Sequence, residues 1–103
     1  MTVSYTDAVA EVDWSHRAEY MSARHGISVD EANEALADPD ALVFDPDYAS
    51  QSGRSVRTIG WSVTYGGLVT VITVAEAGVI YGVNGWPSNA IDTRHYEGDD
   101  PDE

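Results

Sequence analysis

The spacing of apolar positions changes once along this chain, from a helical period in the first third to a strand-like alternation afterwards. Between residues 13 and 25, side chains that recur every three or four positions share one helical face: Trp14, Ala18, Met21 and His25. Gly26 follows, and a glycine with positive φ commonly ends a helix. The pattern therefore predicts a first helix over Asp13–His25.

A second helix has a clear start signal. Ser28 and Glu31 form the S-x-x-E pattern of a capping box, in which each residue's side chain bonds the other's backbone N–H. Asp38-Pro39 then stops the helix, because proline disfavours helical backbone in the residue before it. We expect this helix over residues 29–37.

The alternation of apolar and polar residues after residue 40 predicts three to four strands. We expect them over residues 41–44, 55–65, 68–75 and 79–84, with residues 47–53 as a loop. Residues 68–75 are nearly all apolar, as in a strand covered on both faces. Gly66-Gly67 predicts a two-residue hairpin turn.

The end of the chain predicts one more short helix. Gly85-Trp86-Pro87 breaks the last strand, and Ser88 or Asn89 then caps the helix. The predicted class is α+β, with two N-terminal helices, an antiparallel β-meander of three to four strands and a short C-terminal helix. We expect one domain over residues 1–97, beginning with a short irregular arm or edge strand, and a disordered acidic tail over residues 98–103.

Length and composition limit the number of domains, the cellular compartment and the kinds of site that this chain can have. A chain of 103 residues suffices for one core. No apolar run approaches the roughly 18 residues that span a bilayer, and the acidic N-terminal stretch does not resemble a signal peptide. The absence of cysteine excludes disulfides and thiolate zinc sites. We expect a cytoplasmic protein with no membrane partner and no cofactor.

The charge is strongly acidic, with eighteen Asp and Glu against five arginines and no lysine, for a net charge of −13. Nucleic-acid-binding domains normally carry clustered cations, so the charge disfavours RNA as a partner. Three explanations stay open: solubility, adaptation to high salt, and mimicry of nucleic acid by a surface that occupies another protein's basic groove.

Several segments, in order and spacing over about 80 residues, resemble the BrnT family of toxins within the RelE/ParE superfamily. The segments are RHGISVDEANEALADPDA at 24–41, GRSVRTIG at 53–60, LVTVITV at 68–74 and VIYGVNGWPSNAIDTRHY at 79–96. The resemblance implies an RNA-cleaving toxin that is bound and held inactive by a small antitoxin. The toxin would then form a hetero-oligomer with the antitoxin or a homo-oligomer with itself.

The resemblance also implies where the site lies. It places Arg24, His25, Arg57, Asp92, Arg94 and Tyr96 on family positions. However, Trp86 stands where the family usually has an arginine, and Arg94 is the only cation left from a basic last helix. The thinned set of cations predicts a ribonuclease of weakened or altered activity.

The chemistry of these residues suits metal-independent RNA cleavage. His25 or His95 would serve as base or acid, and Arg57 and Arg94 would clamp a phosphate. Trp61, Trp86 or Tyr96 would stack a base. We therefore assign Arg57, Arg94, His25 and Tyr96 as candidate catalytic residues, and Arg24 and Trp86 as candidate substrate-binding residues. Several of these residues have a structural alternative. Arg57 would pair with an acidic neighbour, the tryptophans would pack, and His25 would simply end its helix.

No metal site is expected. The repeated DPD at residues 38–40 and 45–47 lacks the EF-hand pattern, and solvent-facing turn residues explain it. The leading hypothesis is a BrnT-like protein of a toxin–antitoxin-type system that binds a cognate antitoxin-like protein. The alternative is a non-enzymatic acidic decoy that binds a basic protein surface. Whether the protein is an enzyme stays open at this point.

Overall fold

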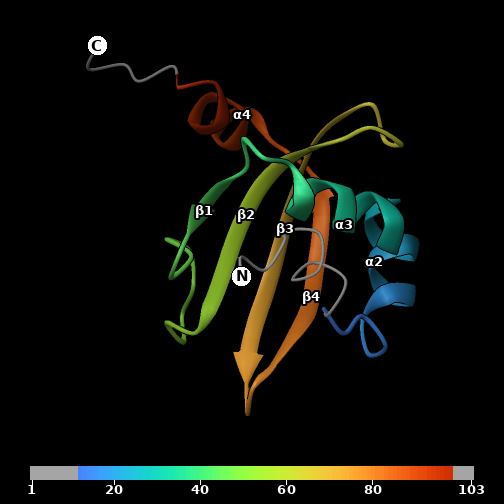
Figure 1. Cartoon of the computed structure of the whole chain (residues 1–103), viewed down its shortest axis with the longest axis vertical. Coiled ribbons are helices and arrows are strands. Elements are labelled where there is room, and N and C mark those ends of the chain that lie inside the picture. Colours follow the sequence, from blue (N-terminus) through green and yellow to red (C-terminus); the bar gives the residue numbers. More distant parts are fainter. Residues whose placement is uncertain (1–11, 99–103) are drawn as a thin grey trace, which may run out of the picture.

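A computed structural model describes residues 12–98, which form a four-stranded antiparallel sheet and three helices (Figure 1). In chain order the elements are α2 (Ala18–His25), α3 (Val29–Ala37), β1 (Leu42–Phe44), β2 (Ser55–Ser62), β3 (Gly67–Glu76), β4 (Val79–Pro87) and α4 (Ala90–Glu97). The strands lie in the order β1-β2-β3-β4. This arrangement confirms the predicted α+β class, meander and flanking helices. Most of the predicted arm and tail, residues 1–11 and 99–103, lies outside the described residues.

The cap signals in the sequence are confirmed. Gly26 ends α2 with φ of 73°, in the left-handed region. At the start of α3, Ser28 Oγ accepts the Glu31 N–H at 3.1 Å, and Glu31 Oε1 accepts the Ser28 N–H at 2.8 Å. These two bonds satisfy donors that a helix start leaves unpaired.

The first helix begins later than predicted, at Ala18 instead of Asp13. Asp13 instead forms a parallel bridge to Tyr81, donating its N–H to the Ile80 carbonyl at 2.8 Å and accepting the Gly82 N–H at 2.8 Å. The chain thus lies against the free edge of β4 before it turns into α2. Trp14 fitted the helical spacing, but it is buried because it packs over Gly82.

Helices α2 and α3 cover one face of the sheet and form the core with it. The buried cluster comprises Trp14, Met21, Ile27, Ala32, Ala35, Leu36, Val69 and Val71. α3 approaches β2 so closely that a Cβ built on Gly60 would lie 2.0 Å from the Ala35 carbonyl oxygen. Glycine at this position therefore sets the distance between helix and sheet.

The β2–β3 connection differs from the predicted two-residue turn. Ser62 pairs with Gly67, which leaves a four-residue turn over residues 63–66. Glu34 of α3 accepts hydrogen bonds from Ser62 Oγ at 2.8 Å, from the Thr64 N–H at 2.8 Å and from Thr64 Oγ1 at 2.6 Å. A side chain distant in sequence therefore fixes the turn, which explains why local turn rules missed it.

The last strand also runs further than predicted. β4 continues through Gly85 to Pro87, pairing Trp86 with Thr70, after a register shift at residues 72–73. Gly85 lies against the core within this strand, where an added Cβ would be 2.9 Å from the Met21 sulfur. No helix within residues 12–98 is long and apolar enough to cross a membrane.

Replacing Gly60 tests the contact between helix and sheet. Gly60→Ala should lower the free energy of unfolding by about 1–3 kcal/mol or more, because its methyl group would overlap the rigid Ala35 backbone. Urea denaturation measures the loss. Gly67→Ala is the matched control, since its Cβ would meet only the side chain of Tyr65, at 3.2 Å. Equal stability of the two variants would contradict the described packing.

The Glu34 hydrogen bonds predict acid sensitivity. The bonds from Thr64 chiefly, and from Ser62, hold the pKa of Glu34 below its ordinary value of 4.5. The unfolded chain therefore binds more protons, and the stability from Glu34 is present above pH ~4.5 and is lost as the pH falls through its folded pKa. Between about pH 5 and 3, the free energy of unfolding in urea should fall less steeply in Glu34→Gln and Thr64→Val than in the wild type. A wild-type slope in both variants would show that Glu34 does not stabilise the turn through its charge.

Candidate functional site

Arg57 lies in the first half of β2, where its side chain is buried against two carboxylates. Its Nε donates to Asp47 Oδ1 at 2.7 Å and its Nη1 donates to Asp92 Oδ2 at 2.7 Å. The side chains of Arg57, Asp47 and Asp92 are 8%, 6% and 0% exposed. The site is thus an ion triad inside the protein.

Three separate segments supply the triad. Asp47 follows β1, Arg57 belongs to β2, and Asp92 lies in the first turn of α4. Asn89 positions Asp92 by capping α4, with its side-chain oxygen accepting the Asp92 N–H at 2.8 Å. The triad therefore joins α4 and the loop after β1 to the sheet.

Further hydrogen bonds complete the coordination of Asp92. Its carboxylate also accepts from the Tyr48 hydroxyl and from Thr70 Oγ1 at 3.0 Å. Thr70 Oγ1 lies 2.8 Å from Ser88 Oγ, which extends the network to the start of α4. Among the residues that the structure describes, no buried side-chain nitrogen or oxygen lacks a hydrogen-bond partner. This matters because an unpaired buried polar atom would be costly.

The electrostatics of the triad hold the protonation states of Arg57 and Tyr48 constant near neutral pH. Burial acts to lower the pKa of Arg57, but Asp47 and Asp92 outweigh it and raise that pKa, so the guanidinium stays charged. Burial, followed by the hydrogen bond to Asp92, raises the pKa of Tyr48 to about 12. Tyr48 therefore stays a neutral donor, and its ring lies 4.5 Å from the guanidinium carbon.

The structure brings three of the predicted site residues together. The guanidinium carbon of Arg57 lies 5.5 Å from the Trp86 ring, and the His25 ring lies 5.9 Å from the same tryptophan. β2, the end of β4 and the C-terminus of α2 thus meet here. Arg24 is exposed beside His25.

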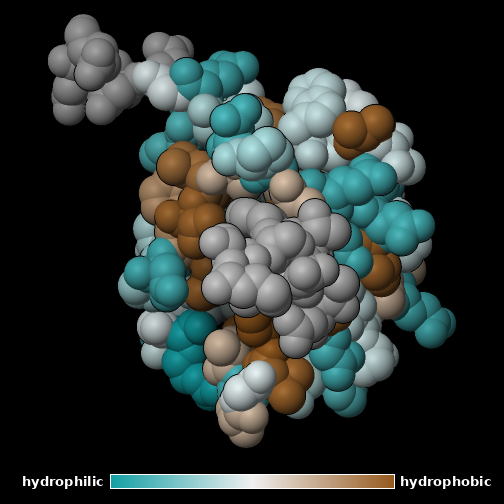
Figure 2. All heavy atoms as spheres, in the orientation of Figure 1, coloured by the Kyte–Doolittle hydropathy of each residue, from teal (hydrophilic) through white to brown (hydrophobic). Residues whose placement is uncertain are grey.

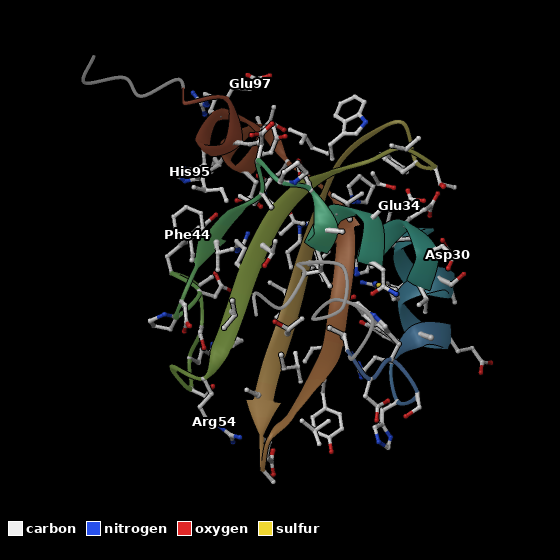
Figure 3. The ribbon with its side chains drawn as sticks, viewed as in Figure 1. Asp30, Glu34, Phe44, Arg54, His95 and Glu97 are labelled. Atoms are coloured by element: carbon white, nitrogen blue, oxygen red, sulfur yellow. The ribbon has the colours of Figure 1, made fainter. Side chains whose placement is uncertain are left out.

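The other predicted residues lie on α4. The Tyr96 hydroxyl donates to Asp38 Oδ2 at 2.7 Å, and this bond, together with burial, raises the pKa of Tyr96 to about 12. Arg94 is exposed, and the ion pairs found within residues 12–98 involve only Arg54 and Arg57. His95 packs against Phe44, with ring centres 5.2 Å apart. Figure 3 labels these two side chains, which lie next to each other.

Arg57 therefore adopts the structural alternative raised by the sequence, pairing with acidic neighbours. Its role as a phosphate clamp stays a prediction, but Nε and Nη1 already donate to carboxylates. The triad has one positive and two negative groups, so a phosphate would meet repulsion there. This arrangement is suited to holding segments together.

Sequence reasoning missed Asp47 and Asp92 as partners of Arg57. The prediction that the second DPD faces solvent is wrong for Asp47, which is only 7% exposed. A usable signal was present: an arginine alternating with Ile59 in a strand must bury its charge, and buried charges are paired. No group of three metal-ligating side chains occurs within the described range 12–98.

No protein-family model matches this chain, and no curated protein matches it significantly. The resemblance to the BrnT family therefore stays an expectation based on the segments quoted above. The functional proposal depends on the geometry of the described residues together with that resemblance.

Truncating Asp92 tests the triad. Asp92→Ala should lower the free energy of unfolding by about 3–5 kcal/mol, because it leaves Arg57 with one partner in a buried site. Urea denaturation followed by circular dichroism measures this loss. Asp30→Ala, at an exposed position in the first turn of α3, is the control and should change stability by about 0.5 kcal/mol or less. Similar losses in both variants would contradict a buried triad.

Proposed function

We propose that this protein is a BrnT-like member of a toxin–antitoxin-type system, acting in the cytoplasm, whose retained activity is binding a small antitoxin-like protein. One observation carries the proposal: Arg57, the cation expected to act on RNA, is held by two buried carboxylates. The order of helices and strands is the one predicted from the hydrophobic pattern, and it is compatible with the resemblance.

The surroundings of Arg57 favour partner binding over RNA cleavage. A phosphate would have to displace Asp47 or Asp92 from the guanidinium. Trp86 lies at the corner where the resemblance implies an arginine, and Tyr96 with a pKa of about 12 is a poor general base at neutral pH. The net charge of −13 adds repulsion at longer range.

A second candidate function is the acidic decoy, and the strongly negative charge of the chain favours it. Arg54 pairs with Glu76 at 3.1 Å and Arg57 is internal, so two of the five arginines are already compensated. The buried triad removes one arginine and two aspartates from the surface, so the rest of the chain keeps four arginines against sixteen acids, a formal charge of −12. Such a surface suits a basic protein groove, and the two candidates differ in how their binding responds to salt.

An RNA-cleavage assay tests the enzymatic half of the proposal. Purified protein incubated with total RNA should leave it intact, because the phosphate-binding cation is engaged. Arg94→Ala and His25→Ala should then have no effect on RNA. Cleavage that either substitution reduces by about tenfold or more would contradict the proposal and restore these residues as catalytic.

Co-expression tests the binding half. The product of a small neighbouring gene in the native host should co-purify with this protein as a stable complex. An antitoxin interface with an apolar centre should persist at about 0.5 M salt, where the Debye length is only a few ångströms. If the protein is instead an acidic decoy, its affinity for a basic partner should fall steeply as the salt concentration rises. Loss of the complex at high salt would favour the decoy. Failure of any neighbouring product to bind would overturn the proposal.

A further inference from the structure

The tip of the β2–β3 hairpin carries apolar side chains into solvent. Trp61 is 47% exposed, Val63 is 79% exposed and Tyr65 is 41% exposed. Figure 2 shows a small hydrophobic spot among pale residues at the upper right, where this hairpin lies in Figure 1. Turns are usually built from glycine, proline and small polar residues, so three large apolar residues within five positions are unusual.

These apolar side chains are not what holds the turn. Glu34 binds Ser62 and Thr64, and Ser62 Oγ also accepts the Tyr65 N–H at 3.1 Å. On the other side, Asp38 Oδ2 accepts the Trp61 N–H at 2.8 Å. The backbone of the tip is therefore fixed by polar groups, and the apolar side chains stand on a preorganised support. Preorganisation lowers the entropy that binding would otherwise cost.

The elements that hold the tip are acidic. α3 carries Asp30, Glu31 and Glu34 and no basic residue, and Asp38 and Asp40 follow it. Figure 3 shows Asp30 and Glu34 on this side of the molecule, with Arg54 at the opposite end of β2. α4, which reaches Asp38 through Tyr96, adds one exposed charge of each sign, Arg94 and Glu97. The charge around the tip is thus negative.

We propose that the hairpin tip, formed by Trp61, Val63 and Tyr65, is the docking surface for a basic partner segment that presents aliphatic side chains flanked by lysine or arginine. Aromatic residues on a fixed support are frequent interface anchors, and the acids on α3 complement the basic flank. The identity of the carrier as an antitoxin-like protein rests on the proposed function. A second copy of this chain fits poorly, because it brings the same charge of −13.

A synthetic helical peptide tests the surface without the native partner. The probe contains leucines at positions i, i+3, i+4 and i+7 with lysines elsewhere. On ¹⁵N-labelled protein, its addition should shift the amide signals of residues 61–66 and of α3. Trp61→Ser/Val63→Ser should weaken binding roughly tenfold, since interface anchors carry most of the affinity. Val79→Ser/Ile80→Ser, at the exposed β3–β4 hairpin, is the matched control and should keep wild-type affinity.

Other outcomes overturn the proposal. Signals shifted evenly over the surface, or equal affinity of the two double variants, would show nonspecific attraction. Self-association that depends on Trp61 in sedimentation equilibrium would assign the tip to a second copy. Because the probe is not the native partner, failure of co-expression would remove the proposed function and leave this result standing. A co-purified partner that protects a different surface would remove only the docking site.

Discussion

The ion triad of Arg57, Asp47 and Asp92 is the interaction on which the arrangement of this small protein depends. Helices α2 and α3 bury an apolar core on one face of the sheet, but the other face meets α4 and a loop through charge. A buried guanidinium is acceptable only when carboxylates surround it closely, so these segments have little freedom to move independently. The residue that looked most suited to chemistry therefore serves as the link between the sheet and its second layer.

The fold could be predicted from the sequence where its signals are local. The capping box at Ser28 and the glycine stop at Gly26 involve residues within four positions of each other, and both were found correctly. The errors lie where distant residues decide. The Asp13 backbone pairs with β4 instead of starting a helix, and Glu34 sets the length of the hairpin turn. Periodicity contains no information about such contacts.

The candidate site was predictable only in part for a related reason. Sequence resemblance selected Arg57, Trp86 and His25, and the fold does gather them. The resemblance did not reveal that Asp47 and Asp92 form ion pairs with the Arg57 guanidinium. In the sequence, Asp47 looks like an ordinary turn residue and Asp92 like an ordinary first-turn residue of a helix. Net charge adds a second hint to the alternation of Arg57 with Ile59, although neither was used in the prediction. In a chain with so few cations, a cation buried in the sheet will find carboxylates near it.

Two separate parts of the sequence determine the shape of the hairpin tip and the side chains that it displays. The shape of the turn is encoded in α3, through Glu34, while the side chains it displays are encoded in the turn itself. Trp61, Val63 and Tyr65 can therefore be exchanged by mutation without changing the hydrogen bonds that hold their backbone. A substitution at one of these positions would change what the tip presents to solvent and leave the shape of the turn as it is.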